Sequence, residues 1–106
     1  MNEFNEYLDT NGIPIAFGSL TALALTRRKA VTALDILMEH GKPILGGDVF
    51  VLVDNHLVPV YANWHCNQRA DETKLEFSKR SIVAALDYIN NYPVNKEEPY
   101  FVFVLR

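Results

Sequence analysis

Hydrophobic residues at helical spacing predict two main helices in this chain. The first follows Thr26, a suitable N-cap, and ends at Gly41 with Pro43 just beyond. The second follows the capping-box pair Thr73 and Glu76, whose side chains can each accept a hydrogen bond from the other's backbone N–H. The apolar positions are Ala30, Val31, Leu34, Leu37 and Met38 in the first helix, and Leu75, Ile82, Leu86 and Ile89, broadened by Val83 and Ala85, in the second. Each stripe is expected to pack one helix face against a core.

Three apolar segments predict the strands of an antiparallel sheet. Residues 48–53 and 57–62 flank a polar turn at 54–56 and form a hairpin, while residues 100–105 are apolar without interruption. We expect this last strand in the centre of the sheet, beside the first hairpin strand, because so hydrophobic a strand would promote aggregation at an edge. Pro59 lacks a backbone donor and therefore favours an edge strand or a bulge.

The N-terminal quarter of the chain is less regular. Residues 3–9 predict a short amphipathic helix with its apolar side chains on one side, whereas residues 20–25 fit a strand and a helix equally well. A chain of 106 residues has the length of one hydrophobic core. We therefore expect a single domain, residues 1–106, of the α+β class, in which the hairpin and the C-terminal strand form a small antiparallel sheet packed against two main helices.

Composition and charge narrow the range of partners. Hydrophobic residues make up 49% of the chain and charged residues 22%, as expected of a folded protein. The net charge of −3 provides no basic field for phosphates, so nucleic-acid binding is not expected and a basic protein partner fits better. The single cysteine excludes an internal disulfide, the acidic N-terminus does not resemble a signal peptide, and no segment is suited to spanning a membrane. These features favour the cytoplasm and leave the oligomeric state open.

The residues with catalytic or metal-binding potential do not form a recognisable motif. A nucleophilic Cys66 needs a nearby base, and the adjacent His65 would point to the opposite face if the strand continued. Together with His56, these residues lack the ligand spacing of a zinc site, so neither a metal nor a cofactor is expected. Two alternatives stay open: a small cytoplasmic enzyme using Cys66 or a histidine, and a structural subunit that forms homo-oligomers through its edge strand.

The segment before the first hairpin strand has a structural interpretation. Gly46 and Gly47 predict a sharp change of chain direction, since glycine adopts backbone angles closed to other residues. Asp48 is expected to support that turn by accepting backbone hydrogen bonds or by pairing with a basic residue. Trp64, at the end of the hairpin, is expected in the core.

Several of these segments in combination resemble a known family. They are Gly46-Gly47-Asp48-Val49-Phe50, Asn63-Trp64 with Cys66, Arg80-Ser81 and Tyr88-Ile89. Their combination resembles the immunity protein 40 group of bacterial polymorphic-toxin systems over roughly residues 26–92. The chain departs from the expected pattern at Ala62, where an acidic residue is expected, and at His65, where a tyrosine is expected. The resemblance implies a cytoplasmic protein, encoded beside a secreted or contact-delivered toxin, that binds the C-terminal domain of that toxin and neutralises it without catalysing a reaction.

Recognition residues are expected at the ends of the hairpin and in the loop that follows it. Many toxins of these systems are nucleases with basic substrate clefts, which an acidic inhibitor suits because complementary charge raises association rates. The candidate partner-binding residues are Asp54, His56, Asn63, His65, Asp71 and Glu72. A second acidic candidate patch consists of Glu3, Glu6 and Asp9.

Overall fold

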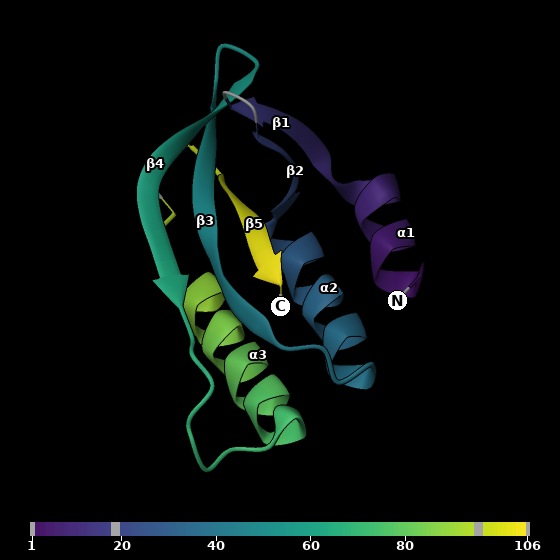
Figure 1. The fold of residues 1–106 in the computed structure, drawn as a ribbon. Coiled ribbons are helices and arrows are strands. Elements are labelled where there is room, and N and C mark those ends of the chain that lie inside the picture. Colours follow the sequence, from purple (N-terminus) through teal and green to yellow (C-terminus); the bar gives the residue numbers. More distant parts are fainter. Residues whose placement is uncertain (1, 18–19, 95–96, 106) are drawn as a thin grey trace.

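Three helices and five strands make up the described part of the chain (Figure 1). The computed structural model describes residues 2–17, 20–94 and 97–105. The elements are α1 (Asn2–Asn11), β1 (Ile13–Phe17), β2 (Leu20–Thr26), α2 (Arg27–Glu39), β3 (Ile44–Val53), β4 (His56–His65), α3 (Lys74–Asn91) and β5 (Pro99–Leu105). The predicted α+β class is confirmed, as are the two main helices and the short N-terminal helix. None of the described helices is long and apolar enough to cross a membrane.

The strands form one antiparallel sheet in the order β1-β2-β5-β3-β4. The C-terminal strand β5 lies in the centre and pairs with β3, as its hydrophobic sequence predicts. The edge strand β4 contains Pro59, which confirms the edge position expected of that residue. The expectation of three strands was incomplete, because β1 and β2 form a second hairpin that joins β5 through two residue pairs, Leu25 with Phe101 and Thr26 with Tyr100.

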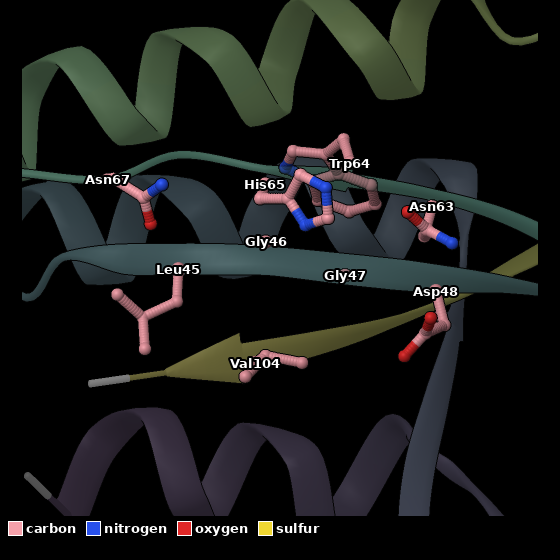
Figure 2. A pocket seen from close by; sticks show the side chains of 9 residues that line it. All are labelled: Leu45, Gly46, Gly47, Asp48, Asn63, Trp64, His65, Asn67 and Val104. Carbon is pink, nitrogen blue, oxygen red and sulfur yellow. The ribbon is translucent and has the colours of Figure 1, made fainter.

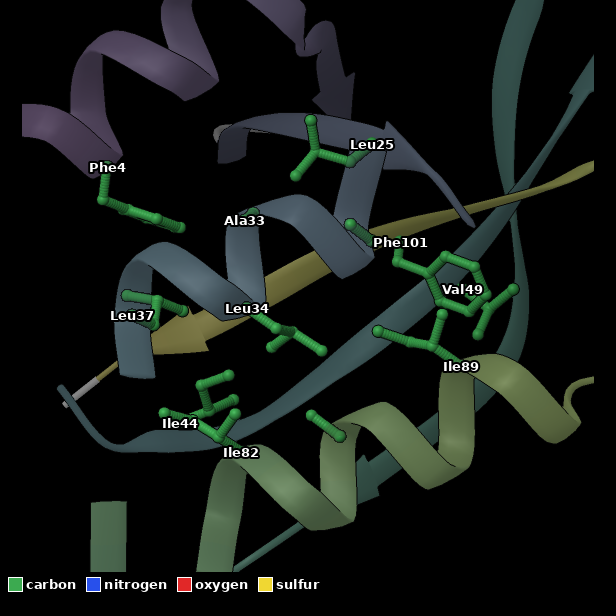
Figure 3. Close-up of a cluster of buried hydrophobic side chains, with 12 residues drawn as sticks. Phe4, Leu25, Ala33, Leu34, Leu37, Ile44, Val49, Ile82, Ile89 and Phe101 are labelled. Carbon is green, nitrogen blue, oxygen red and sulfur yellow. The ribbon is translucent and has the colours of Figure 1, made fainter. Parts of the chain in front are cut away.

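One face of the sheet is covered by α2 and α3, and the main core lies between these helices and the strands (Figure 3). Both predicted N-caps are present: the Thr26 hydroxyl accepts from the Lys29 backbone N–H, and Thr73 and Glu76 form the complete capping box. The helix α1 packs beside α2 and adds Phe4 to this core. The buried residues of the core are Phe4, Leu25, Ala30, Ala33, Leu34, Leu37, Ile44, Val49, Ile82, Ala85, Ile89 and Phe101.

The buried side of α3 differs from the predicted stripe. Leu75 and Val83 were expected to face the core, but they are 56% and 50% exposed. The residues buried on this helix are Phe77, Ser78, Ser81, Ile82, Ala85 and Ile89. Large and small side chains therefore share the buried side of this helix, and the predicted stripe missed Phe77 and the two serines.

Among the described residues, no helix covers the opposite face of the sheet, and the two ends of this face differ. At the end with the β3–β4 turn, Ile15, Ala24 and Phe50 form a small second cluster, so the β1–β2 hairpin covers this end. Figure 1 shows β1 and β2 beside the turn of the β3–β4 hairpin. At the other end, near the start of β3 and the end of β4, the face is open, and it is here that the family-like motifs lie.

Candidate functional site

Trp64 joins the end of the β3–β4 hairpin to α3. Its indole stacks on Tyr88, with ring centroids 4.6 Å apart and an interplanar angle of 27°, and meets Phe103 edge-on at 6.4 Å. Burial raises the pKa of Tyr88 above its ordinary value, with smaller contributions from Tyr92 and Asp48. Trp64 was expected in the core; it is partly buried and packs against the core cluster, and aromatic pairs of this geometry add stability beyond the area that they bury.

Gly46 and Gly47 allow β4 and the indole to approach β3 closely. A Cβ atom on Gly47 would lie 2.3 Å from Cη2 of Trp64, and one on Gly46 would lie 2.0 Å from the Trp64 carbonyl oxygen. The expected change of chain direction was wrong, because β3 runs through both glycines from Ile44 to Val53. The glycine conformation instead accommodates an irregularity in the pairing with β5 between Ile44 and Gly46, where Gly46 has φ 152°.

Ser81 anchors α3 to the start of β3. The backbone N–H of Ile44 donates to the Ser81 hydroxyl at 3.0 Å, and this hydroxyl donates to the carbonyl oxygen of Ser78 at 3.0 Å. Both serines are fully buried. The hydroxyl of Ser78 itself has no hydrogen-bond partner among the described residues, so the two serines differ sharply in what they contribute.

Arg80 holds the loop between β4 and α3. Its Nε donates to Glu72 Oε2 at 2.6 Å, its Nη1 to Cys66 Sγ at 3.1 Å, and its Nη2 to the carbonyl oxygen of Asn67 at 2.6 Å. The hydrogen bond from Arg80, with a further one from the Arg69 backbone N–H, lowers the pKa of Glu72 to about 2. The side chain of Glu72 is only 9% exposed, so its carboxylate serves chiefly to fix the loop.

The helix-free face at this end of the sheet contains a shallow hollow of about 440 Å³, shown in Figure 2. Two cross-strand rows form it. One row places Asn63 of β4 opposite Asp48 of β3, and the other places His65 opposite Gly46, with Val104 of β5 on the far side of Gly46. In Figure 2, Asp48 and Asn63 lie at one end of the hollow, and the His65 ring lies near Gly46. The hollow therefore opens where Gly46 has no side chain.

The polar side chains around the hollow have no partners within the described chain. Asp48, Asn63 and His65 make no side-chain hydrogen bond or ion pair with another described residue. All three are exposed. The expectation that Asp48 supports a turn was wrong, because its carboxylate points away from the main core, opposite to the neighbouring Val49.

The six residues predicted to bind a partner lie in three separate places. Asn63 and His65 share the hollow. Asp54 is at the turn of the hairpin, and His56 beside it lines a smaller depression with β1. Asp71 is exposed in the loop before α3, next to the engaged Glu72. In the second acidic patch, Glu3 contacts His40 at 2.9 Å. The assignment of any of these residues to a partner remains a prediction.

Asp48 is the acidic residue at the hollow, and the sequence alone did not predict a binding role for it. Because side chains alternate along a strand, the sequence indicates that Asp48 and Val49 point to opposite faces of the sheet. The residue of β4 that lies opposite Asp48, however, could not be found by counting from the turn. Between the paired positions Phe50–Pro59 and Asp48–Asn63, β4 contains two more residues than β3. Tyr61 lies in this irregular stretch with φ 61° and is 82% exposed. Counting without the bulge would place Tyr61, and not Asn63, opposite Asp48.

The fold and this site define a small α+β protein in which helices cover one sheet face and leave polar side chains available on the other. The model of the immunity protein 40 family matches residues 8–105, and the chain belongs to this family. The chain matches no curated protein and no solved structure. The resemblance seen in the motifs is thus confirmed, and the match extends beyond them at both ends. Among the described residues, no group of three histidine, cysteine, aspartate or glutamate side chains is placed to hold a metal ion.

Proposed function

We propose that this protein neutralises a cognate bacterial toxin by binding the toxin's C-terminal domain and blocking its active site or an adjacent surface. The observation that carries this proposal is the family match over residues 8–105, since an immunity protein protects against a toxin. The protein acts in the cytoplasm of the toxin-producing cell and its siblings, on a toxin delivered by contact or secretion. Protection comes from binding, without a catalysed reaction.

The arrangement of the motif residues supports a binding role. Four motif residues hold the end of the hairpin rigidly against α3 and the following loop: Trp64, Gly47, Ser81 and Arg80. A rigid surface loses little conformational freedom when a partner docks, which favours tight binding. The net charge of −3 favours association with a basic surface such as the substrate cleft of a nuclease.

Co-expression with the neighbouring toxin gene tests this function. The gene immediately upstream is expected to encode a large exported protein, and its C-terminal domain alone should arrest growth when produced in the cytoplasm. Co-expression of this chain should restore growth, and the two proteins should co-purify as a complex that weakens with added salt. An unrelated immunity protein produced at the same level is the control. Growth arrest that persists despite soluble expression of this chain would refute the proposal.

A further inference from the structure

We propose that the hollow formed by Gly46, Asp48, Asn63 and His65 receives a basic side chain, a guanidinium group above all, presented by the protein partner. The identity of that partner rests on the proposed function, whereas the chemistry of the hollow does not. A guanidinium carries only hydrogen-bond donors in a planar fork, so it requires acceptors that are close together and not otherwise engaged.

Such acceptors are present on adjacent strands. Asp48 and Asn63 are direct cross-strand neighbours, which places their Cβ atoms about 5 Å apart on the same face. The Asp48 carboxylate can take two parallel N–H donors of a guanidinium, and the Asn63 side-chain oxygen can take a third. His65 follows Asn63 on the same face of β4 and can receive a further donor or stack its ring against the planar group.

The charge of the hollow also matches a basic occupant. Asp48 is the only acidic or permanently charged side chain among the lining residues, which are Leu45, Gly46, Gly47, Asp48, Asn63, Trp64, His65, Asn67 and Val104. No described cation pairs with its carboxylate. A cation from outside the chain therefore meets a negative charge that is already in place, beside apolar surface from Val104 and Leu45 for the aliphatic stem.

Three other acidic side chains of the described chain are less available or lack such a neighbour. Glu72 is bound by Arg80, and Glu3 is bound by His40. Asp54 is exposed at the hairpin turn, without an acceptor amide directly across from it. The strand segment before Asp48 is also held in position, because Trp64 packs closely against the neighbouring Gly47. This pre-organisation reduces the entropy lost when a side chain enters.

An NMR titration tests the chemistry without any toxin. The probe is N-acetyl-arginine amide, added at low salt to the ¹⁵N-labelled chain, with N-acetyl-citrulline amide as its neutral analogue. Saturable shifts are expected for the backbone amides of residues 46–48 and 63–65, with the arginine probe only. D48N should abolish them. The matched control D35N makes the same charge change at an exposed position of α2, outside the hollow, and should leave them intact. Shifts that spread over α1 or the turn, or that persist unchanged in D48N, would overturn the proposal.

The toxin domain then provides a second test. Association of the unmodified chain with the domain encoded upstream should be weakened at least about tenfold by D48N and changed less than about twofold by D35N. Thermal unfolding of both variants checks that neither is misfolded. Binding that is insensitive to D48N would overturn this inference and leave the proposed function standing. Absence of any binding by the unmodified chain would refute the proposed function, while the arginine titration would still decide the chemistry of the hollow.

Discussion

The two faces of the sheet use neighbouring residues of the same strands in different ways. On the helix-covered face, Trp64 stacks on Tyr88 and lies against Gly47. On the open face, the side chains of Asn63 and His65, which flank Trp64 in sequence, have no described hydrogen-bond partner. At this end of β4, the side chain of Trp64 therefore anchors the hairpin, whereas the side chains of its two sequence neighbours expose polar groups. We therefore predict that stability and the proposed recognition can be changed separately here, residue by residue.

The largest effect is expected from Trp64→Ala on the covered face. This change removes the stack with Tyr88 and leaves a cavity above Gly47, which should lower the free energy of unfolding by about 3 kcal/mol. Denaturant titration followed by circular dichroism measures the loss. A change below about 1 kcal/mol would show that the indole contributes little to the fold and would remove the distinction between the two faces.

A smaller loss is expected from Ser81→Ala. The variant leaves the buried backbone N–H of Ile44 without its acceptor, which should cost about 2 kcal/mol. Ser78→Ala is the matched control, because the Ser78 hydroxyl is equally buried but has no described partner, and its removal should be neutral or stabilising. Urea unfolding of the two variants compares them directly. Equal destabilisation would show that helix packing, and not the Ile44 hydrogen bond, determines the effect.

The next effect appears only in acid and concerns the loop beside the hollow. The pKa of Glu72 is about 2 in the folded chain, below its ordinary value of 4.5, so its contribution to stability is complete above about pH 4.5 and is lost as the pH falls toward 2. Glu72→Gln should therefore unfold with a flatter dependence of stability on pH across this range. Asp71→Asn, in the same loop, should follow the unmodified chain. Parallel curves for Glu72→Gln and the unmodified chain would contradict the role of the Arg80 contact.

The smallest effects on stability are expected on the open face. Asn63→Ala and Asp48→Asn remove exposed polar groups without described partners, so each should change the free energy of unfolding by less than about 0.5 kcal/mol. Thermal unfolding at neutral pH measures this. A loss as large as that of Trp64→Ala would mean that these groups hold the hairpin together, and the open face would then lose its distinct role.

The sequence predicted much of the architecture because the relevant signals are local. The capping box at Thr73 and Glu76 forms as expected, and Thr26 caps α2, since both depend on residues within one helical turn. The uninterrupted apolar run of β5 correctly indicated a central strand. The candidate site was predicted only in part: Asn63 and His65 lie in the hollow, whereas their acidic neighbour was assigned to a turn that does not exist.

The amino-acid sequence alone determined the type and order of the main elements, the helix caps and the edge position of Pro59. Each of these follows from short-range sterics and hydrogen bonding. Only the tertiary structure decided which carboxylates are available. Arg80 binds Glu72 across eight positions of sequence, and the bulge at Tyr61 places Asn63 opposite Asp48. The first outcome depends on how the loop folds against α3 and the second on strand register, and a pattern of hydrophobic and polar positions predicts neither.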